Sequence, residues 1–176
     1  MILGLLSRLR ASERGAAVIE MALVAPVLAL GVIGVVDMSN AYSKKLALEQ
    51  GAQRAIEKIM NTTETNTVET TLANEAVCQV NGMNANGTCK TSPITTGNVT
   101  VSWRLDCTTG GTTTSQTTTD ATTYDGYVNG CAGTKAGYVQ VTVTDTYSPL
   151  FPIHFASYDV TNHVYNVSAT AGTRTM

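Results

Sequence analysis

Histidine is scarce in this chain, and the familiar sequence motifs of enzyme active sites are missing. The 176 residues include only two histidines, His154 and His163. The sequence has no Gly-x-Ser-x-Gly elbow, no Walker glycine loop and no zinc-protease His-Glu motif. We therefore predict a protein that is not an enzyme, with no catalytic residue, no metal site and no bound cofactor.

Positive charge is also scarce. Eleven Lys and Arg residues stand against thirteen Asp and Glu residues, a formal net charge of −2. No basic surface therefore points to nucleic acid as a partner. The charge is unevenly distributed, because residues 1–15 carry three arginines and one glutamate, whereas the remainder carries eight basic and twelve acidic residues.

Charge is absent from one long apolar segment. No charged side chain occurs between Met21 and Val36, and residues 16–19 are also uncharged. A helix over residues 16–36 would be about 31 Å long at ~1.5 Å per residue, enough to cross a ~30 Å hydrocarbon core. The arginines that precede this segment favour a cytoplasmic N-terminus. An ordinary signal peptide cut after Ala29 or Gly34 is the alternative, and the carboxylate of Glu20 argues against it.

Glu20 is the one ionisable residue inside the apolar segment. A carboxylate placed in a membrane helix is energetically expensive, so it marks a functional site for which a partner is expected. The plainer alternative is that the Glu20 side chain reaches the lipid headgroups and does nothing specific.

The pattern changes after Val36 without a helix stop. Charged and apolar residues now interleave, and the apolar ones recur at three- and four-residue steps, as in an amphipathic helix. These apolar positions are Met38, Ala41, Leu48, Ala52, Ala55 and Ile59, widened by Tyr42 and Ile56. We expect one helix from Ala16 to about Met60, with a kink or local unwinding at Pro26.

The start of this helix resembles a known family. A glycine at Gly15 followed by a glutamate at Glu20 is similar to the type IV prepilin cleavage motif. Residues 14–26, with Pro26 eleven residues into the mature chain, resemble the start of TadE-like pseudopilins of tight-adherence pili. The resemblance continues to about Met60 and returns weakly at residues 138–143 and 147–152, whereas residues 61–134 match no family pattern.

The resemblance implies a processed, membrane-anchored subunit. A prepilin peptidase would cut between Gly15 and Ala16, removing a leader of residues 1–15. The mature chain would have a transmembrane half-helix at 16–36, an amphipathic half-helix at 37–60 and an exported β-rich domain at 61–176. The implied location is the bacterial inner membrane, with a single pass, a cytoplasmic N-terminus and later incorporation into a pilus at the cell surface.

The implied partners are the peptidase, the inner-membrane pilus assembly platform and other pilins, both the major Flp-type pilin and minor ones. A minor or tip position suits this chain, and Glu20 would pair with the α-ammonium of Ala16 in a neighbouring subunit. Two alternatives stay open: a single-pass membrane-anchored binding or adhesion protein, and a pseudopilin of a type II secretion system.

Cysteine is absent from the first 77 residues and occurs four times afterwards, at Cys78, Cys89, Cys107 and Cys131. With a cytoplasmic N-terminus, all four would lie in an oxidising compartment where disulfides persist. Their wide spacing does not fit structural zinc sites. Of three possible connectivities we favour Cys78–Cys89 with Cys107–Cys131, because each bond closes a loop rich in Gly, Asn or Thr.

The C-terminal region predicts a small antiparallel sheet. Apolar and polar residues alternate over 99–105, 139–144 and 163–169, a pattern typical of half-buried strands. One face of the sheet should pack on the amphipathic half-helix, which gives an α+β, pilin-like fold.

A threonine-rich stretch lies between Cys107 and Cys131. Ten of its 23 residues are threonine, so residues 108–130 predict a long exposed loop, either a solvated tether or a mobile binding tip. Asp120, Asp125 and Asn129 offer oxygen ligands there, and calcium binding is a minor alternative, since EF-hand spacing is absent.

Overall fold

The computed structural model describes residues 13–61, 65–151 and 158–176. A long helix, α2 (Glu13–Asn61), leads into a shorter one, α3 (Thr65–Asn81). A 3₁₀ turn, η1 (Thr96–Asn98), precedes β1 (Val99–Thr109) and β2 (Thr112–Thr118), and α4 (Ala121–Gly130) precedes β3 (Thr134–Tyr147), β4 (Tyr158–Asp159) and β5 (Val164–Arg174). The α+β fold expected from the sequence is confirmed.

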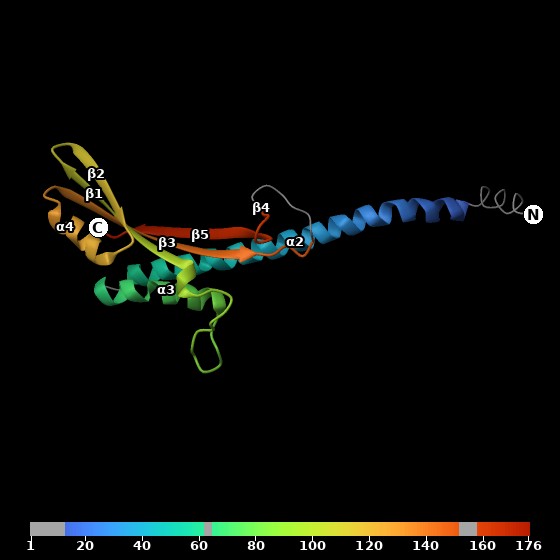
Figure 1. The fold of residues 1–176 in the computed structure, drawn as a ribbon, viewed down its shortest axis with the longest axis horizontal. Helices are drawn as coiled ribbons and strands as arrows, with labels where there is room; N and C mark the ends of the chain where they lie inside the picture. Colours follow the sequence, from blue (N-terminus) through green and yellow to red (C-terminus); the bar gives the residue numbers. More distant parts are fainter. Residues whose placement is uncertain (1–12, 62–64, 152–157) are drawn as a thin grey trace, which may run out of the picture.

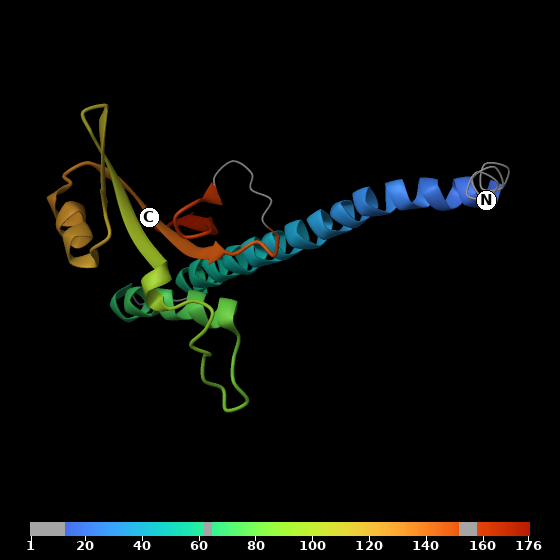
Figure 2. The same cartoon turned by 45° about the vertical axis from the view of Figure 1, so that its right-hand side comes forward.

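The five strands form one antiparallel sheet in the order β2-β1-β3-β5-β4. The three alternating patterns seen in the sequence correspond to β1, β3 and β5. One face of the sheet lies along the C-terminal half of α2, while the N-terminal half of α2 extends far beyond the sheet (Figure 1). Figure 2 shows the same separation from a second direction.

The core lies between the sheet and the C-terminal half of α2. From α2, Leu48 and Ala52 are fully buried, and from β3 so are Val141 and Val143. Because side chains alternate across a strand, the same strands turn Thr, Ser and Gln residues to the opposite, uncovered face. The predicted packing of the sheet on the amphipathic half-helix is therefore correct.

The helix α2 continues through Pro26 without interruption. The local unwinding considered for this position is therefore not present, and the kink at Pro26 stays a prediction. At 49 residues it is roughly 70 Å long, as the helix rise requires. Its end at Asn61 lies one residue beyond the expected Met60.

The helix α3 was missed by the sequence interpretation, which placed residues 61–176 in a β-rich domain. Its apolar residues Leu72, Ala76 and Val80 follow helical spacing, and α3 packs antiparallel to the end of α2. The two helices come so close at Gly51 that an added Cβ would lie 2.5 Å from Cγ2 of Val80. The many threonines of this segment, which favour strands, hid the helical period.

The prediction of a long exposed loop between Cys107 and Cys131 is wrong. Gly110 and Gly111, with φ of 57° and 84°, form the two-residue turn of a hairpin that joins β1 to β2. After β2 the chain forms α4, whose Tyr124 is buried in the core. Threonine favours strands, so a threonine-rich segment can pair as a hairpin as readily as it can form a loop.

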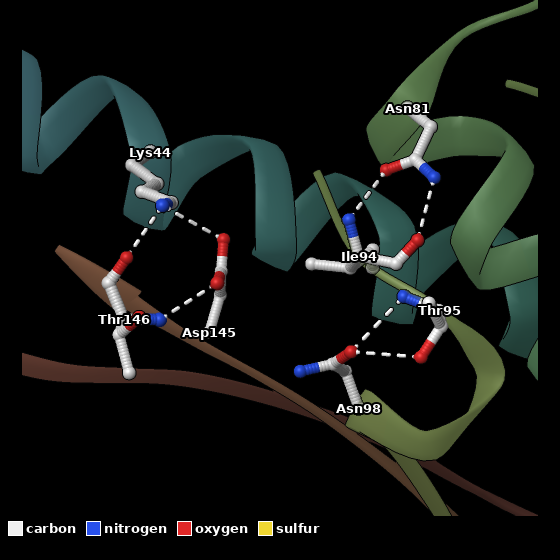
Figure 3. A network of polar contacts seen from close by, with 7 residues as sticks. All are labelled: Lys44, Asn81, Ile94, Thr95, Asn98, Asp145 and Thr146. Atoms are coloured by element: carbon white, nitrogen blue, oxygen red, sulfur yellow. Dashed lines mark hydrogen bonds and ion pairs between the residues drawn. The ribbon is translucent and has the colours of Figure 1, made fainter. Parts of the chain in front are cut away.

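Two disulfides connect Cys78 with Cys89 and Cys107 with Cys131, the sequential pairing favoured above. The first joins α3 to the segment that follows it, and the buried side chain of Asn81 holds the same segment. Its amide donates to the carbonyl of Ile94 (2.7 Å) and its oxygen accepts from the Ile94 amide (3.0 Å) (Figure 3). The amide also donates to the carbonyl of Lys90 (2.9 Å). These contacts fix residues 82–95 without a regular element of their own.

Candidate functional site

The N-terminal half of α2 exposes almost its whole apolar surface. Leu23 and Val35 are each 70% exposed, and no described strand or helix covers residues 17–29 of α2. Among the described residues, this helix is long and apolar enough to cross a membrane. A surface of this size and character does not stay in water, so lipid or other protein chains must cover it.

Glu20 lies within this exposed apolar surface. Its side chain has no hydrogen bond or ion pair to any other described residue, so the partner expected for it does not come from this part of the chain. Glu20 and Ala16 are four residues apart in α2 and therefore lie on the same side of the helix. Gly15 also falls in α2, while residues 1–12 of the expected leader lie outside the described residues.

Asp37 ends the uncharged segment and ties the helix to the sheet. One oxygen of its carboxylate accepts hydrogen bonds from the Tyr147 hydroxyl and from the Leu150 amide, the latter at 3.0 Å. The same hydroxyl lies 3.1 Å from the Asp37 carbonyl. Burial, followed by the hydrogen bond to Asp37 and its negative charge, raises the pKa of Tyr147 to about 12. The end of β3 is thus fixed beside the start of the amphipathic half-helix.

A second connection lies two helical turns further along α2. The ammonium group of Lys44 forms a 2.8 Å ion pair with Asp145 and donates to the carbonyl of Thr146 (Figure 3). Sequence reasoning missed both connections, because the partners are more than 100 residues apart. The only available signal was that Asp37 is the first charged residue after the apolar segment.

The uncovered face of the sheet carries a shallow polar hollow. Tyr138 lines it, with the Arg104 guanidinium 4.4 Å from the ring centroid, a cation–π contact. Arg104 also pairs with Asp106 at 3.1 Å, and Arg174 lies opposite Tyr138 on β5. Arginine, tyrosine and hydroxyl groups on one open surface are suited to binding a polar ligand.

The residues considered for calcium have structural roles or stand apart. The carboxylate of Asp120 caps α4, accepting from the amide (2.8 Å) and the hydroxyl of Thr123. These hydrogen bonds hold the pKa of Asp120 below its usual value. Asp125 and Asn129 are exposed within α4, and the described residues contain no group of three or more His, Cys, Asp or Glu side chains arranged for a metal.

The two histidines of the sequence were the remaining candidates for a catalytic side chain. His163 lies exposed just before β5, with Nδ1 3.2 Å from the Tyr158 hydroxyl. His154 lies outside the described residues.

Residues 15–56 match the model of a protein family described as TadE-like protein. The matched segment begins at Gly15 and includes Glu20, Asp37 and Lys44, so it covers the apolar half of α2 and most of the amphipathic half. The resemblance noted from the sequence is thereby confirmed for this segment, and the family it matches is structural rather than enzymatic. Comparisons with curated proteins and with solved structures gave no match.

Proposed function

We propose that this chain is a membrane-anchored, pilin-like subunit, a minor pilin or pseudopilin needed for assembly or for the tip of a tight-adherence pilus. The observation that carries the proposal is the family match from residue 15, on a helix whose apolar half is uncovered and contains Glu20. A subunit of this kind needs an apolar segment that serves first as an anchor and then as an assembly surface. The lack of packing partners for residues 17–29 among the described parts of the chain supports this use.

The proposal includes processing and location. A prepilin peptidase cuts after Gly15, and the mature chain begins at Ala16 in the bacterial inner membrane, with its N-terminus in the cytoplasm. The sheet and its helices lie on the exported side, where both disulfides are stable. The partners are the peptidase, the assembly platform of the inner membrane, the major Flp-type pilin and other minor pilins.

Glu20 selects the axial position of the subunit in this proposal. Cleavage creates an α-ammonium at Ala16, and Glu20 of one subunit pairs with that group on its neighbour. In a medium of low dielectric constant such a pair is poorly screened, while either charge alone is costly to bury. The pair therefore favours one register over others.

The N-terminal residue of the membrane-associated protein, determined by mass spectrometry, tests the proposal. We expect Ala16 in the parent chain, and Gly15→Ile should leave the precursor with its fifteen leader residues because the side chain obstructs the peptidase. Gly4→Ile, in the same leader but away from the cut, is the control and should be processed normally. A parent protein that keeps residue 1, or begins after residue 25, contradicts the proposal.

A second candidate function rests on the polar hollow around Tyr138. The chain is then a single-pass anchored protein whose sheet binds a polar surface ligand, with Arg104 and Arg174 as contacts. An anchor of this kind needs neither Gly15 nor Glu20. The same mass spectrum helps to separate the two functions. A protein that keeps its leader and still binds a polar surface ligand favours the binding role.

A further inference from the structure

An apolar groove of about 960 Å³ lies where the end of the sheet overhangs α2. Its floor is the helix surface around Ile33, Gly34 and Met38, and its wall comes from the sheet and from Phe151, which follows β3. The groove has the size and apolar character of pockets that hold small ligands. An added Cβ at Gly34 meets nothing within 4 Å, so the floor is open at that point.

The groove begins within the uncharged segment of α2. Ile33 and Gly34 precede Asp37, the first charged residue after Glu20. If the apolar half of α2 crosses the bilayer, as the proposed function requires, this part of the groove opens at the level where the hydrocarbon core meets the headgroups. The groove is therefore continuous with the lipid-facing surface of the helix.

Aromatic residues gather at the same level. The chain has ten Phe, Trp and Tyr residues, and five of them lie on or beside this end of the sheet and the adjacent turn of α2. The five are Tyr42, Tyr147, Phe151, Tyr158 and Tyr165. Tyrosine is enriched at membrane–water interfaces, where its ring is in apolar surroundings and its hydroxyl is hydrated.

Large aliphatic side chains are also exposed at this end of the sheet. Leu150 is 62% exposed and Val160 is 73% exposed; Leu150 precedes Phe151, and Val160 lies two residues after Tyr158. Of the charges nearby, Asp37 accepts from Tyr147 and Lys44 is paired with Asp145, while the Asp159 carboxylate accepts hydrogen bonds from the Thr161 and Asn162 amides and can stay at the hydrated headgroup level. An apolar rim whose nearby charges are paired or remain hydrated can rest on lipid at low cost.

From these observations we infer that the groove is a lipid site, occupied by an acyl chain of a bilayer phospholipid, with the end of the sheet seated on the membrane surface. The occupant follows from continuity, because lipid surrounds the helix surface that forms the groove floor. The aromatic rim and the exposed Leu150 and Val160 then lie among the headgroups. This inference rests on the membrane anchoring in the proposed function.

Site-specific photo-crosslinking tests the inference on the full chain in vesicles of phosphatidylethanolamine and phosphatidylglycerol. Benzoylphenylalanine replaces one residue in each of three samples: Phe151 in the groove wall, Leu23 in the exposed apolar helix, and Tyr138 on the uncovered face of the sheet. After irradiation, mass spectrometry distinguishes an adduct with one phospholipid from a crosslink to a second chain. We expect phospholipid adducts from Phe151 and Leu23 and none from Tyr138.

Filling the groove provides the matched comparison. Gly34→Leu in the Phe151-labelled chain should lower the lipid adduct about fivefold or more, because an acyl chain and the new side chain compete for one space. Val32→Leu is the control, because Val32 is exposed on α2 and does not line the groove. It should leave the adduct unchanged.

The outcomes separate the inference from its premise. No lipid adduct from Leu23 means that the helix is not in the bilayer, and the anchoring fails together with the inference. An adduct from Leu23 without one from Phe151 overturns the lipid site alone. A crosslinked pair of chains from Phe151 also overturns it, because a second copy then occupies the groove.

Discussion

The two halves of α2 belong to one uninterrupted helix but differ in how far their apolar side chains are buried. The C-terminal half buries Leu48 and Ala52 completely against α3 and the sheet, whereas the N-terminal half leaves residues such as Leu23 and Val35 open. The N-terminal half is apolar all round, whereas the C-terminal half is apolar on one side only. The apolar side of the C-terminal half is therefore covered by its own chain, whereas most of the N-terminal half is covered by no other described part of the chain.

Asp37 stands at the boundary between these halves, and its position explains how one helix can serve both. By accepting from Tyr147 and Leu150, it fixes the end of the sheet at the point where the uncovered half begins. Together with the Lys44–Asp145 pair and the buried core, this contact fixes how far the sheet reaches along the helix.

Leucine-to-alanine substitutions in the two halves of α2 should differ most in their effect on the free energy of unfolding. Leu48→Ala should lower the free energy of unfolding by about 2–5 kcal/mol, because it leaves a cavity in a fully buried position. Leu28→Ala, at an exposed position of the other half, should change it by less than about 0.5 kcal/mol. Urea unfolding in detergent micelles, followed by fluorescence of the buried Trp103, measures both. Equal effects would mean that the apolar half is also part of the folded core.

The disulfides should contribute nearly as much to the free energy of unfolding. They should stabilise only the part of the molecule around the sheet. Removing Cys107–Cys131 by paired serine substitutions should cost about 2–4 kcal/mol, and removing Cys78–Cys89 somewhat less, because its closed loop is shorter. Membrane insertion of α2 should be unchanged in both variants. The same urea titration gives the energies, and membrane flotation gives the insertion. Loss of insertion would show that the two regions depend on each other.

The hydrogen bonds accepted by Asp37 should make the next largest contribution to the free energy of unfolding. Tyr147→Phe should lower the free energy of unfolding by about 1.5–3 kcal/mol, the usual value for a hydrogen bond to a charged group. Tyr138→Phe, on the uncovered face of the sheet, should have little effect. Urea unfolding compares the two, and an equal loss in both would remove the special role of Asp37.

The raised pKa of Tyr147 adds a dependence on pH. Because its pKa is about 12 in the folded protein and 10 in its ordinary state, the neutral form is stabilised by folding. That contribution is complete below pH 10 and is lost as the pH rises from 10 through about 12. Tyr147→Phe should lack this decline between pH 10 and 12, whereas Tyr138→Phe should keep it. Unfolding measured across this range in both variants gives the answer.

The sequence was sufficient wherever structure depends on local periodicity. The helix, the three main strands and their packing follow from the spacing of apolar residues, and the disulfide pairing follows from the loops that the cysteines close. Threonine-rich segments were misjudged, because α3 and the β1–β2 hairpin take their structure from packing partners such as Gly51 and from the turn at Gly110 and Gly111. The contact of Asp37 with Tyr147 joins residues 110 positions apart, and no local pattern encodes it.

Glu20 should have the smallest effect on folding, although it is central to the proposed assembly. Its side chain is exposed and has no hydrogen bond or ion pair with another described residue, so Glu20→Ala and Glu20→Gln should leave the free energy of unfolding unchanged within about 0.5 kcal/mol. Membrane insertion should be equal or better, because a carboxylate is removed from an apolar segment. If the proposed assembly is right, incorporation into pili should fall in both variants, since each loses the charge proposed to pair with the α-ammonium of Ala16 in a neighbouring subunit. Glu20→Gln keeps the shape of the side chain, so a loss in this variant assigns the effect to charge.

The measurement is the amount of the protein in sheared pili and its co-purification with other pilins. Normal values in both variants would leave Glu20 without a role in assembly, and the uncovered half of α2 would then act through its apolar surface alone.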